Sequence, residues 1–452
     1  MKPGVSGMVP IAPVRIICQW AKPSKPHSHP ACKHSLGKSP EHWAGRLMSV
    51  DITKHGSKGL MFFLALSLTA ALMNSSAPTP LYPFYQEHLQ INAVDLTFIF
   101  GAYGAGVLLA LTTLARIAGH VKDQRFLLLP AIALVLIGAW LCAECDSLWA
   151  LCAARAISGL GAGIMTTAVN VTLVRFGPLD NGKLAATLAT LAMILGLAFG
   201  PVLSGMALQL NLYPASLPFW SIMALVAVAA LGILALWPRH TLQAQTAAHT
   251  VQASLREGLR GIGRPFHLCA WSVFFSWSFT ACVFVIGPGA AEQQLGLSDR
   301  GMFGYSMAVY LLIAGASQLY CKRLDAARAL RSGLLAQCAA FLLLLTAFSV
   351  HSLTLAALAL VIGGYAYGAI FVGSARLINQ LAPVNCHAKL VAYFYMTIYL
   401  FNAVPIPLGL LVDSIGLTPS VLAALVLFLG LGAVLAILAT RVRFPHAHQQ
   451  PG

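Results

Sequence analysis

Residues 217–237 read LPFWSIMALVAVAALGILALW, a run without any Asp, Glu, Lys or Arg. A helix needs about 20 mostly apolar residues to cross the hydrocarbon core of a bilayer. A membrane-spanning β-strand would alternate apolar and polar residues, and this run does not. The stretch therefore predicts a transmembrane α-helix.

The composition of the whole chain favours the same class. The 452 residues are 58% hydrophobic and 9% charged, whereas a soluble domain has about 25% charged residues. Mean hydropathy is +0.78. Because so few charges cannot cover a water-soluble protein of this length, we expect lipid to form much of its surroundings.

Outward from 217–237, five apolar segments precede this run and six follow it. They lie at 60–81, 96–116, 126–143, 147–170 and 183–208, and then at 267–290, 302–320, 332–349, 352–375, 389–411 and 418–439. We therefore predict an all-α membrane protein with twelve transmembrane helices in two six-helix bundles, 59–237 and 267–441. Two similar halves are typical of secondary transporters.

Polar segments flank the two bundles. Residues 1–58 are rich in Pro, Lys, His and Ser, which predicts a disordered basic tail. This tail has no apolar segment like that of a cleavable signal peptide, and Met48 is a candidate start of translation. Residues 442–452 are predicted to form a cytoplasmic tail.

The linker 238–266 carries apolar residues at helical spacing with arginines between them. The apolar residues are Val251, Leu255, Leu259 and Ile262, and the arginines are Arg256, Arg260 and Arg264. This pattern suits an amphipathic helix on an anionic membrane surface, and it also suits a solvated basic linker.

Basic residues mark one side of the predicted membrane protein. Nineteen Lys and Arg fall in the segments on one side of the twelve spans, and one, Arg300, falls on the other. Because cytoplasmic loops are rich in Lys and Arg, both termini are predicted to be cytoplasmic. The net charge of +15 follows from this bias, and we expect no nucleic-acid partner. The predicted location is a bacterial inner membrane.

No catalytic constellation stands out along the chain. Cys142 and Cys145 form a CxxC pair without a second pair at zinc spacing. No loop is long enough for a soluble catalytic domain, and no nucleophile–base set is recognisable. We predict that the protein is not an enzyme and uses neither a metal nor a cofactor.

Arg155 is the one Lys or Arg inside the predicted spans. A charge at bilayer depth is costly, so it is a functional candidate, although a side chain near the interface could also reach water. It begins the stretch RAISGLGAG, residues 155–163. Gly159 and Gly163 would let a neighbouring helix approach closely. As a phosphate-binding loop the pattern is weak, because no strand precedes it.

The fifth predicted helix contains a proline among glycines. Gly196, Gly200, Pro201 and Gly205 stand in GLAFGPVLSG. Pro201 removes one helical hydrogen bond, and the glycines permit close packing and bending. We expect a hinge or a packing surface there.

These two stretches resemble motifs of the major facilitator superfamily. Arg155–Gly163 is similar to its fourth-helix motif, and Gly196–Gly205 is similar to the fifth-helix motif GxxxGPxxGG, with Ser204 in place of one glycine. The second motif is associated with the drug and metabolite efflux branch. The resemblance implies a monomer that exports a small molecule across the bilayer by alternating access, in exchange for protons.

The family's loop between the second and third helices is altered in this chain. Gly119 stands where an Asp is usual, and Asp123 follows nearby. Arg116 and Asp123 are therefore candidates for a charge relay implied by the resemblance. Residues 322–325 look like a degraded repeat of this loop in the second half.

Polar and aromatic residues inside the spans are candidates for a substrate pocket. They are Asn74, Asn170, Tyr365, Tyr395, Tyr399 and Asn402. Such weakly polar, aromatic walls suit an amphipathic or neutral organic solute. Helix packing could equally account for each residue alone.

No Asp or Glu falls inside the spans, and Asp95 and Asp413 come closest. Proton antiport therefore rests on the resemblance alone. An uptake symporter or uniporter for a sugar or organic acid, and a membrane sensor that does not transport, remain alternatives.

Overall fold

The computed structural model describes residues 58–117, 123–178, 182–238, 255–297, 299–383 and 386–442. Within these ranges twelve helical segments are long and apolar enough to cross a membrane, and no strand occurs among them. The predicted class, an all-α protein with twelve transmembrane helices, is confirmed. The tail before Lys58, residues 239–254 and residues 443–452 lie outside the described part.

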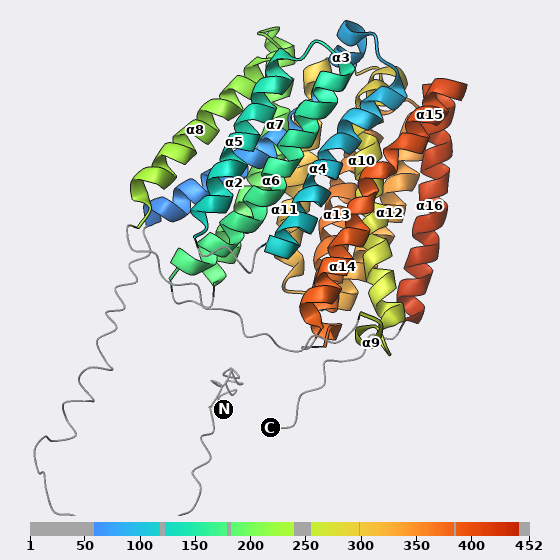
Figure 1. Cartoon of the computed structure of the whole chain (residues 1–452). Helices are drawn as coiled ribbons and strands as arrows, with labels where there is room; N and C mark the ends of the chain where they lie inside the picture. Colours follow the sequence, from blue (N-terminus) through green and yellow to red (C-terminus); the bar gives the residue numbers. More distant parts are fainter. Residues whose placement is uncertain are drawn as a thin grey trace, which may run out of the picture. The chain divides into compact units, whose positions relative to one another are not determined.

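The first half of the chain forms one bundle (Figure 1). Its elements are α2 (Lys58–Ser76), the 3₁₀ turn η1 (Thr79–Leu81), α3 (Tyr82–Leu89), α4 (Ala93–Ile117), α5 (Arg125–Glu144), α6 (Leu148–Phe176), α7 (Lys183–Leu210) and α8 (Leu217–Leu236). Buried apolar residues of these helices form one core, which also takes in Val285 and Ile286 of the second half.

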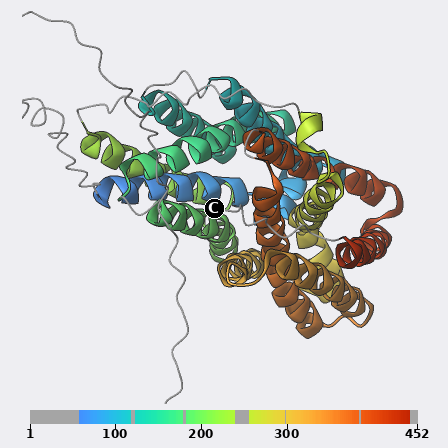
Figure 2. The same ribbon diagram turned by 90° about the horizontal axis from the view of Figure 1, so that it is seen from below.

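The second half of the chain forms the other bundle. Its elements are α9 (Leu255–Gly258), α10 (Gly263–Leu295), α11 (Arg300–Cys321), α12 (Ala326–Ser349), α13 (Leu353–Leu381), α14 (His387–Tyr399), the 3₁₀ turn η2 (Leu400–Ala403), α15 (Pro405–Ile415) and α16 (Leu417–Arg441). Figure 2 shows the helices of the two halves from below as two groups.

Two of the twelve spans are interrupted, and prolines explain both breaks. The first span runs through α2, η1 and α3, and the eleventh through α14, η2 and α15. The sequence predicts 389–411 as one helix. However, Pro405 and Pro407 have no N–H to continue it, so the chain passes through the 3₁₀ turn Leu400–Ala403 before α15 begins.

The linker is described only at its end. α9 covers four residues, and α10 begins at Gly263, inside the segment predicted as linker. Leu259 and Ile262 pack against the core of the second bundle. The amphipathic helix proposed for 238–266 falls largely on residues outside the described ranges and stays a prediction.

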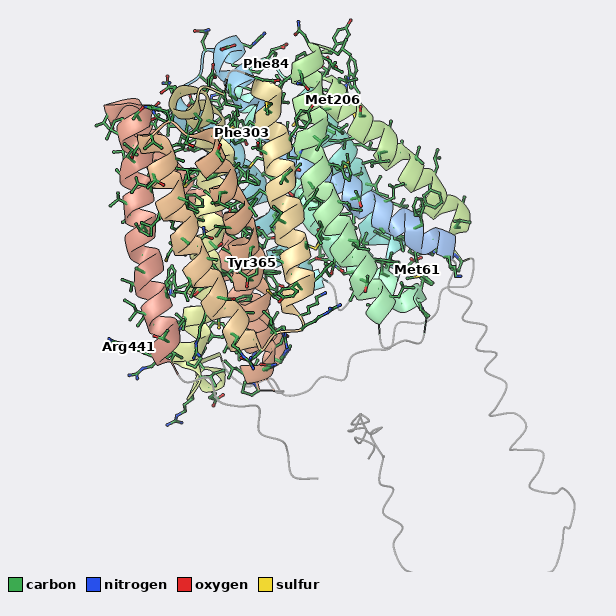
Figure 3. The ribbon with its side chains drawn as sticks, turned by 180° about the vertical axis from the view of Figure 1, so that it is seen from behind. Met61, Phe84, Met206, Phe303, Tyr365 and Arg441 are labelled. Carbon is green, nitrogen blue, oxygen red and sulfur yellow. The ribbon has the colours of Figure 1, made fainter. Side chains whose placement is uncertain are left out.

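The bundles meet along two helix pairs. α7 packs on α11, where Gly205 lies against Gly301 and Pro201 lies against Gly304. α4 packs on α15 through Gly409. Figure 3 shows Phe84, Met206 and Phe303 near one end of the helices and Met61 and Arg441 near the other. We call the first of these the α3 end.

Candidate functional site

The break of the first span leaves backbone carbonyls without helical donors. In a continuous helix the carbonyl of Asn74 would accept from the N–H of residue 78, which is Pro78 and has none. α2 ends at Ser76, two residues before this proline. A helix end buried in this way needs donors from elsewhere.

Arg155 of α6 supplies those donors. Its Nη1 donates to the carbonyl of Asn74 at 3.1 Å, and its Nη2 donates to the carbonyl of Ser75 at 3.0 Å. The side chain is 1% exposed. Partial negative charge at a helix C-terminus favours a cation there. Arg155 therefore stabilises the end of α2, and within the described ranges no carboxylate forms an ion pair with it.

Tyr103 of α4 covers the same guanidinium. Its ring centre lies 4.5 Å from Cζ of Arg155, which is within cation–π range. Close packing of α4 and α6 makes this contact possible, because a Cβ at Gly159 would overlap the carbonyl of Tyr103. One turn later, a Cβ at Gly163 would lie 2.7 Å from Cβ of Ala110. Both predicted glycines thus lie in the α4–α6 contact.

Several buried polar atoms near Arg155 have no hydrogen-bond partner. Nδ2 of Asn74 donates to Oγ of Ser158 at 3.0 Å. In contrast, Oδ1 of Asn74, Nε of Arg155 and the hydroxyls of Tyr82 and Tyr85 are buried and unpaired. Unpaired buried polar atoms are unfavourable, so each of them calls for an explanation.

α7 contacts the end of α2 at the break. Oγ of Ser204 donates to the carbonyl of Ala77 at 2.6 Å. A Cβ at Gly200 would overlap Oγ of Ser76, and one at Gly196 would lie 2.5 Å from the carbonyl of Thr69. The predicted motif on α7 thus packs against α2 through Gly196 and Gly200 and against α11 through Pro201 and Gly205.

The second bundle contributes aromatic residues. The ring of Trp277 stacks on Tyr367 with 5.8 Å between centroids and lies 5.4 Å from Phe401. Nε1 of Trp277 is buried without a partner. Phe401 also lies near Tyr399 and, across the bundle contact, near Phe100 of α4.

Asn402 completes this contact. Its amide donates to the carbonyl of Tyr399 at 2.9 Å, and its side chain lies so close to Gly104 that a Cβ there would overlap it. Phe100, Tyr103 and Gly104 occupy about one turn of α4. α4 therefore contacts two groups of side chains that lie next to each other. We call Arg155 with the unpaired polar atoms around it the Arg155 cluster, and Trp277, Tyr367 and Phe401 the aromatic cluster.

Three predicted pocket residues lie away from these clusters. Asn170 is exposed and donates to the carbonyl of Thr166 in its own helix, about 22 Å along α6 from Arg155. The hydroxyl of Tyr365 bonds that of Ser332 inside the second bundle. Tyr395 lies on α14 beside Phe394. Of the six predicted pocket residues, Asn74, Tyr399 and Asn402 lie near α4 or Arg155. The other three lie away from both.

The relay candidates lie at the opposite end from α3. Arg116 is near the end of α4, and its side chain is outside the described part. Asp123 pairs with Arg125 at 2.6 Å, and this contact lowers the pKa of Asp123. In the second half, Asp325 accepts from the N–H of Arg328 and so caps α12. Both carboxylates accept hydrogen bonds from backbone N–H groups at the start of the helix that follows them.

Four hydrogen bonds join the bundles at the α3 end. The carboxylate of Asp413 accepts from the backbone N–H groups of Ala93 and Val94, both at 3.0 Å. Gln209 of α7 donates to Asp299 at 2.9 Å and accepts from the hydroxyl of Tyr305 at 2.9 Å. Asp413 and Asp299 thus link the two bundles.

Tyr103, Trp277 and Phe401 are not among the predicted site residues. Tyr103 lies in the glycine-rich stretch Phe100–Gly106, and Trp277 is in the middle of an apolar span. For Tyr103, the sequence signal was an aromatic residue beside glycines in a predicted helix. This pattern does not indicate which distant helix the ring contacts.

Comparisons with known proteins give a consistent family. The family model described as Major Facilitator Superfamily matches residues 64–405. The "Putative multidrug resistance protein MdtD" of Pectobacterium carotovorum is 24% identical over 189 residues, which is 40% of this chain and 38% of that protein. The protein of the same name from Serratia proteamaculans is 26% identical over 147 residues, 32% of this chain and 30% of that protein. The chain thus spans about two fifths or less of these relatives.

Solved structures share the fold. A bacterial homologue of the human lysosomal transporter Spinster, inward-facing and unoccupied, has a TM-score of 0.67 at 17% identity, covering 84% of this chain and 96% of that one. A POT family transporter in complex with a thioalcohol-conjugated peptide has a TM-score of 0.68 at 16% identity, covering 85% and 94%. At these identities the likeness concerns the fold.

Proposed function

This chain belongs to the Major Facilitator Superfamily, and from that premise we propose that it is a secondary transporter that exports a small amphipathic organic solute by alternating access. The observation that carries the proposal is the pair of clusters on α4. One cluster holds Arg155 with unpaired polar atoms around it, and the other holds Trp277 and Phe401.

The chemistry of these clusters suggests the kind of solute. Nε of Arg155 and Nε1 of Trp277 are unpaired donors, and Oδ1 of Asn74 is an unpaired acceptor. The stacked rings of Trp277 and Tyr367 provide a flat apolar wall. A partly aromatic compound with one or two hydrogen-bond acceptors would satisfy the donors and bury its apolar part. The multidrug-resistance relatives are in keeping with such a solute.

The contacts between the bundles support alternating access. Asp413 and Asp299 link the bundles at the α3 end. If these links break while the opposite end closes, the clusters on α4 become accessible from the other side. The glycine contacts of α7 with α11 would act as the pivot.

We propose that export is coupled to proton exchange, as the resemblance to the efflux branch implies. Within the described ranges no carboxylate forms an ion pair with Arg155. The negative charge of Asp413 lies at the N-terminus of α4, where it is favourable, so it stabilises closure at the α3 end. We also propose that the protein is a monomer in a bacterial inner membrane, with its termini in the cytoplasm.

Transport by purified protein tests the proposal. Proteoliposomes with an imposed pH gradient should accumulate or release amphipathic aromatic dyes, and the rate should depend on the gradient. Uptake of a sugar or organic acid instead, without dye movement, would favour an importer. Absence of movement of every solute under every gradient would favour a sensor. The Arg155→Met protein provides the inactive control.

A further inference from the structure

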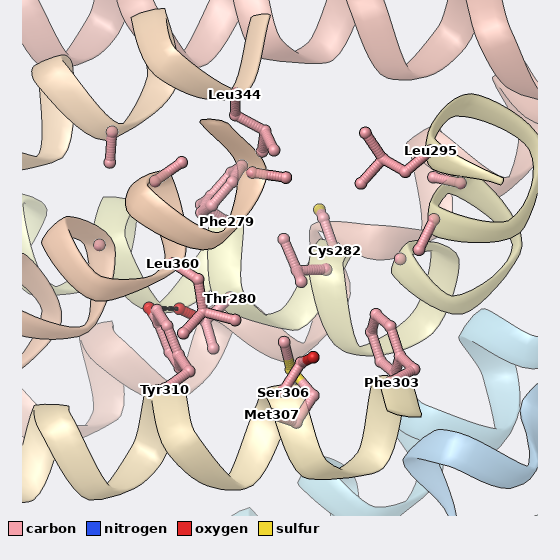
Figure 4. A pocket seen from close by; sticks show the side chains of 18 of the residues that line it. Phe279, Thr280, Cys282, Leu295, Phe303, Ser306, Met307, Tyr310, Leu344 and Leu360 are labelled. Atoms are coloured by element: carbon pink, nitrogen blue, oxygen red, sulfur yellow. Dashed lines mark hydrogen bonds between the residues drawn. The ribbon is translucent and has the colours of Figure 1, made fainter. Parts of the chain in front are cut away.

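A second site lies inside the second bundle, apart from the clusters on α4. It is a cavity of about 470 Å³ between α10, α11, α12, α13 and α16. Figure 4 shows side chains that line it, among them Phe279, Cys282, Phe303, Met307 and Leu360. Neither Trp277 nor Tyr367 belongs to its lining.

The packing of α11 against α13 explains where this cavity lies. A Cβ at Gly364 would be 2.9 Å from the carbonyl of Tyr310, and one at Gly368 would overlap Oγ of Ser317. One residue earlier, Gly363 faces Tyr310 of α11 and Ala340 of α12 at ordinary contact distances of 3.4 and 3.7 Å. The cavity is lined by the N-terminal halves of α11 and α13.

Exposed apolar side chains border the cavity. Met302 and Val309 of α11 and Leu353 of α13 belong to its lining and are 44%, 47% and 48% exposed. On a multi-pass membrane protein, exposed apolar side chains within the spans contact lipid tails. The lining is therefore continuous with the lipid-contacting surface.

The polar groups of the cavity are already paired. The hydroxyls of Thr280 and Tyr310 bond each other at 2.9 Å (Figure 4), and Ser306 donates to the carbonyl of Met302 at 2.9 Å. Within the described ranges none of the unpaired buried side-chain atoms belongs to the lining. Water needs two to four polar partners, and an empty apolar volume is unfavourable in proportion to its size.

We propose that this cavity binds the acyl chain of a bilayer lipid, which enters between the N-terminal halves of α11 and α13. The inference goes beyond the proposed transport function. It does not depend on which solute is transported or on the direction of transport. An acyl chain matches the apolar lining, and the surrounding bilayer supplies it at high local concentration.

Photochemical labelling tests this site. The full-length protein is placed in nanodiscs that contain a phosphatidylcholine with a diazirine in the middle of one acyl chain, and labelled peptides are identified by mass spectrometry. We expect adducts on Cys282, Phe303 and Met307. These residues are 6%, 7% and 4% exposed, so lipid outside the protein does not reach them. Adducts confined to exposed residues such as Leu335 would overturn the proposal.

Variants make the test specific. Ala340→Phe places a ring in the cavity, and Ala290→Leu fills it from α10 with a smaller change. Either should reduce labelling of the three buried residues by about tenfold, equivalent to about 1.4 kcal/mol of binding, and leave labelling of Leu335 unchanged. Leu358→Phe on the lipid-facing side of α13 is the matched control, because Leu358 is exposed and outside the lining. Unchanged labelling of the buried residues in both filling variants would overturn the proposal.

Discussion

The helix pair α4–α6 of the first bundle and the pair α11–α13 of the second are built alike. α6 and α13 are both 29 residues long. When their first residues are aligned, Gly159 and Gly163 correspond to Gly364 and Gly368. Gly159 packs on the carbonyl of Tyr103, and Gly364 packs on the carbonyl of Tyr310. Tyr103 then covers Arg155, and the hydroxyl of Tyr310 bonds that of Thr280 in α10.

The pairs differ in where they carry a charge. Arg155 of α6 aligns with Leu360 of α13. In the first bundle α2 breaks before Pro78, and Arg155 satisfies the exposed carbonyls. In the second bundle α10 does not break: it continues through Pro288 to Leu295, and Pro288 leaves only the carbonyl of Phe284 without its helical donor. An apolar residue is sufficient there, and Leu360 lines the apolar cavity instead. The helix break therefore explains the buried charge.

The largest effect is expected from Arg155→Met. Its loss leaves the carbonyls of Asn74 and Ser75 without donors, which should lower the free energy of unfolding by about 2–4 kcal/mol. Displacement of the α2 end should reduce the initial transport rate by about 100-fold. Thermal unfolding in detergent and flux in proteoliposomes measure the two effects. Leu360→Met, the aligned change in α13, should alter neither. Equal effects of both changes would contradict the comparison.

A methyl group at the two aligned glycines should have unequal effects. Gly159→Ala places Cβ against a backbone oxygen at overlapping distance, whereas Gly364→Ala leaves 2.9 Å. We expect a loss of about 2–3 kcal/mol for Gly159→Ala and about 1 kcal/mol for Gly364→Ala. Chemical unfolding of both variants measures the difference. A larger loss at Gly364 would show that the tighter contact lies in the second bundle.

Restoring an N–H at position 78 should partly compensate for the loss of Arg155. Pro78→Ala provides a donor for the carbonyl of Asn74, so the double variant Pro78→Ala/Arg155→Met should show a coupling of about 1 kcal/mol in a double-mutant cycle. Pro288→Ala, inside α10, combined with Arg155→Met is the matched control and should show no coupling. Purely additive effects at position 78 would disprove the link between the break and the arginine.

The smallest effect concerns the contact between the bundles. Asp413→Asn removes a charge from the N-terminus of α4, which is worth about 0.5–1 kcal/mol. In a cysteine-free background with Thr97→Cys, an impermeant thiol reagent should then react about two to five times faster. Asp95→Asn is the control, because Asp95 accepts from Asn92 within the first bundle. If the thiol at position 97 reacted at the same rate in Asp413→Asn as in the protein that retains Asp413, Asp413 would not contribute to closure of the α3 end.

Local patterns predicted the spans well because long apolar runs identify membrane helices. The ends were less accurate, since α6 continues to Phe176 and α13 to Leu381, beyond the apolar runs. Sequence also indicated Arg155, because a buried charge is costly. Its partners are backbone carbonyls 80 and 81 residues away. Because every residue has a carbonyl, the sequence does not show which ones Arg155 binds. Asn170 and Tyr365 lie elsewhere than expected because membrane helices are apolar on every face, so their rotation cannot be deduced from hydropathy.

Arg155 has no carboxylate partner within the described ranges, so no side chain of opposite charge neutralises it at bilayer depth. A charge that crosses the full membrane potential gains or loses about 2.3 kcal/mol per 100 mV. If the first bundle tilts during the cycle, Arg155 moves through part of that electric field. Each tenth of the field then contributes about 0.2 kcal/mol at 100 mV. Transport of an uncharged solute by this protein would therefore depend on voltage.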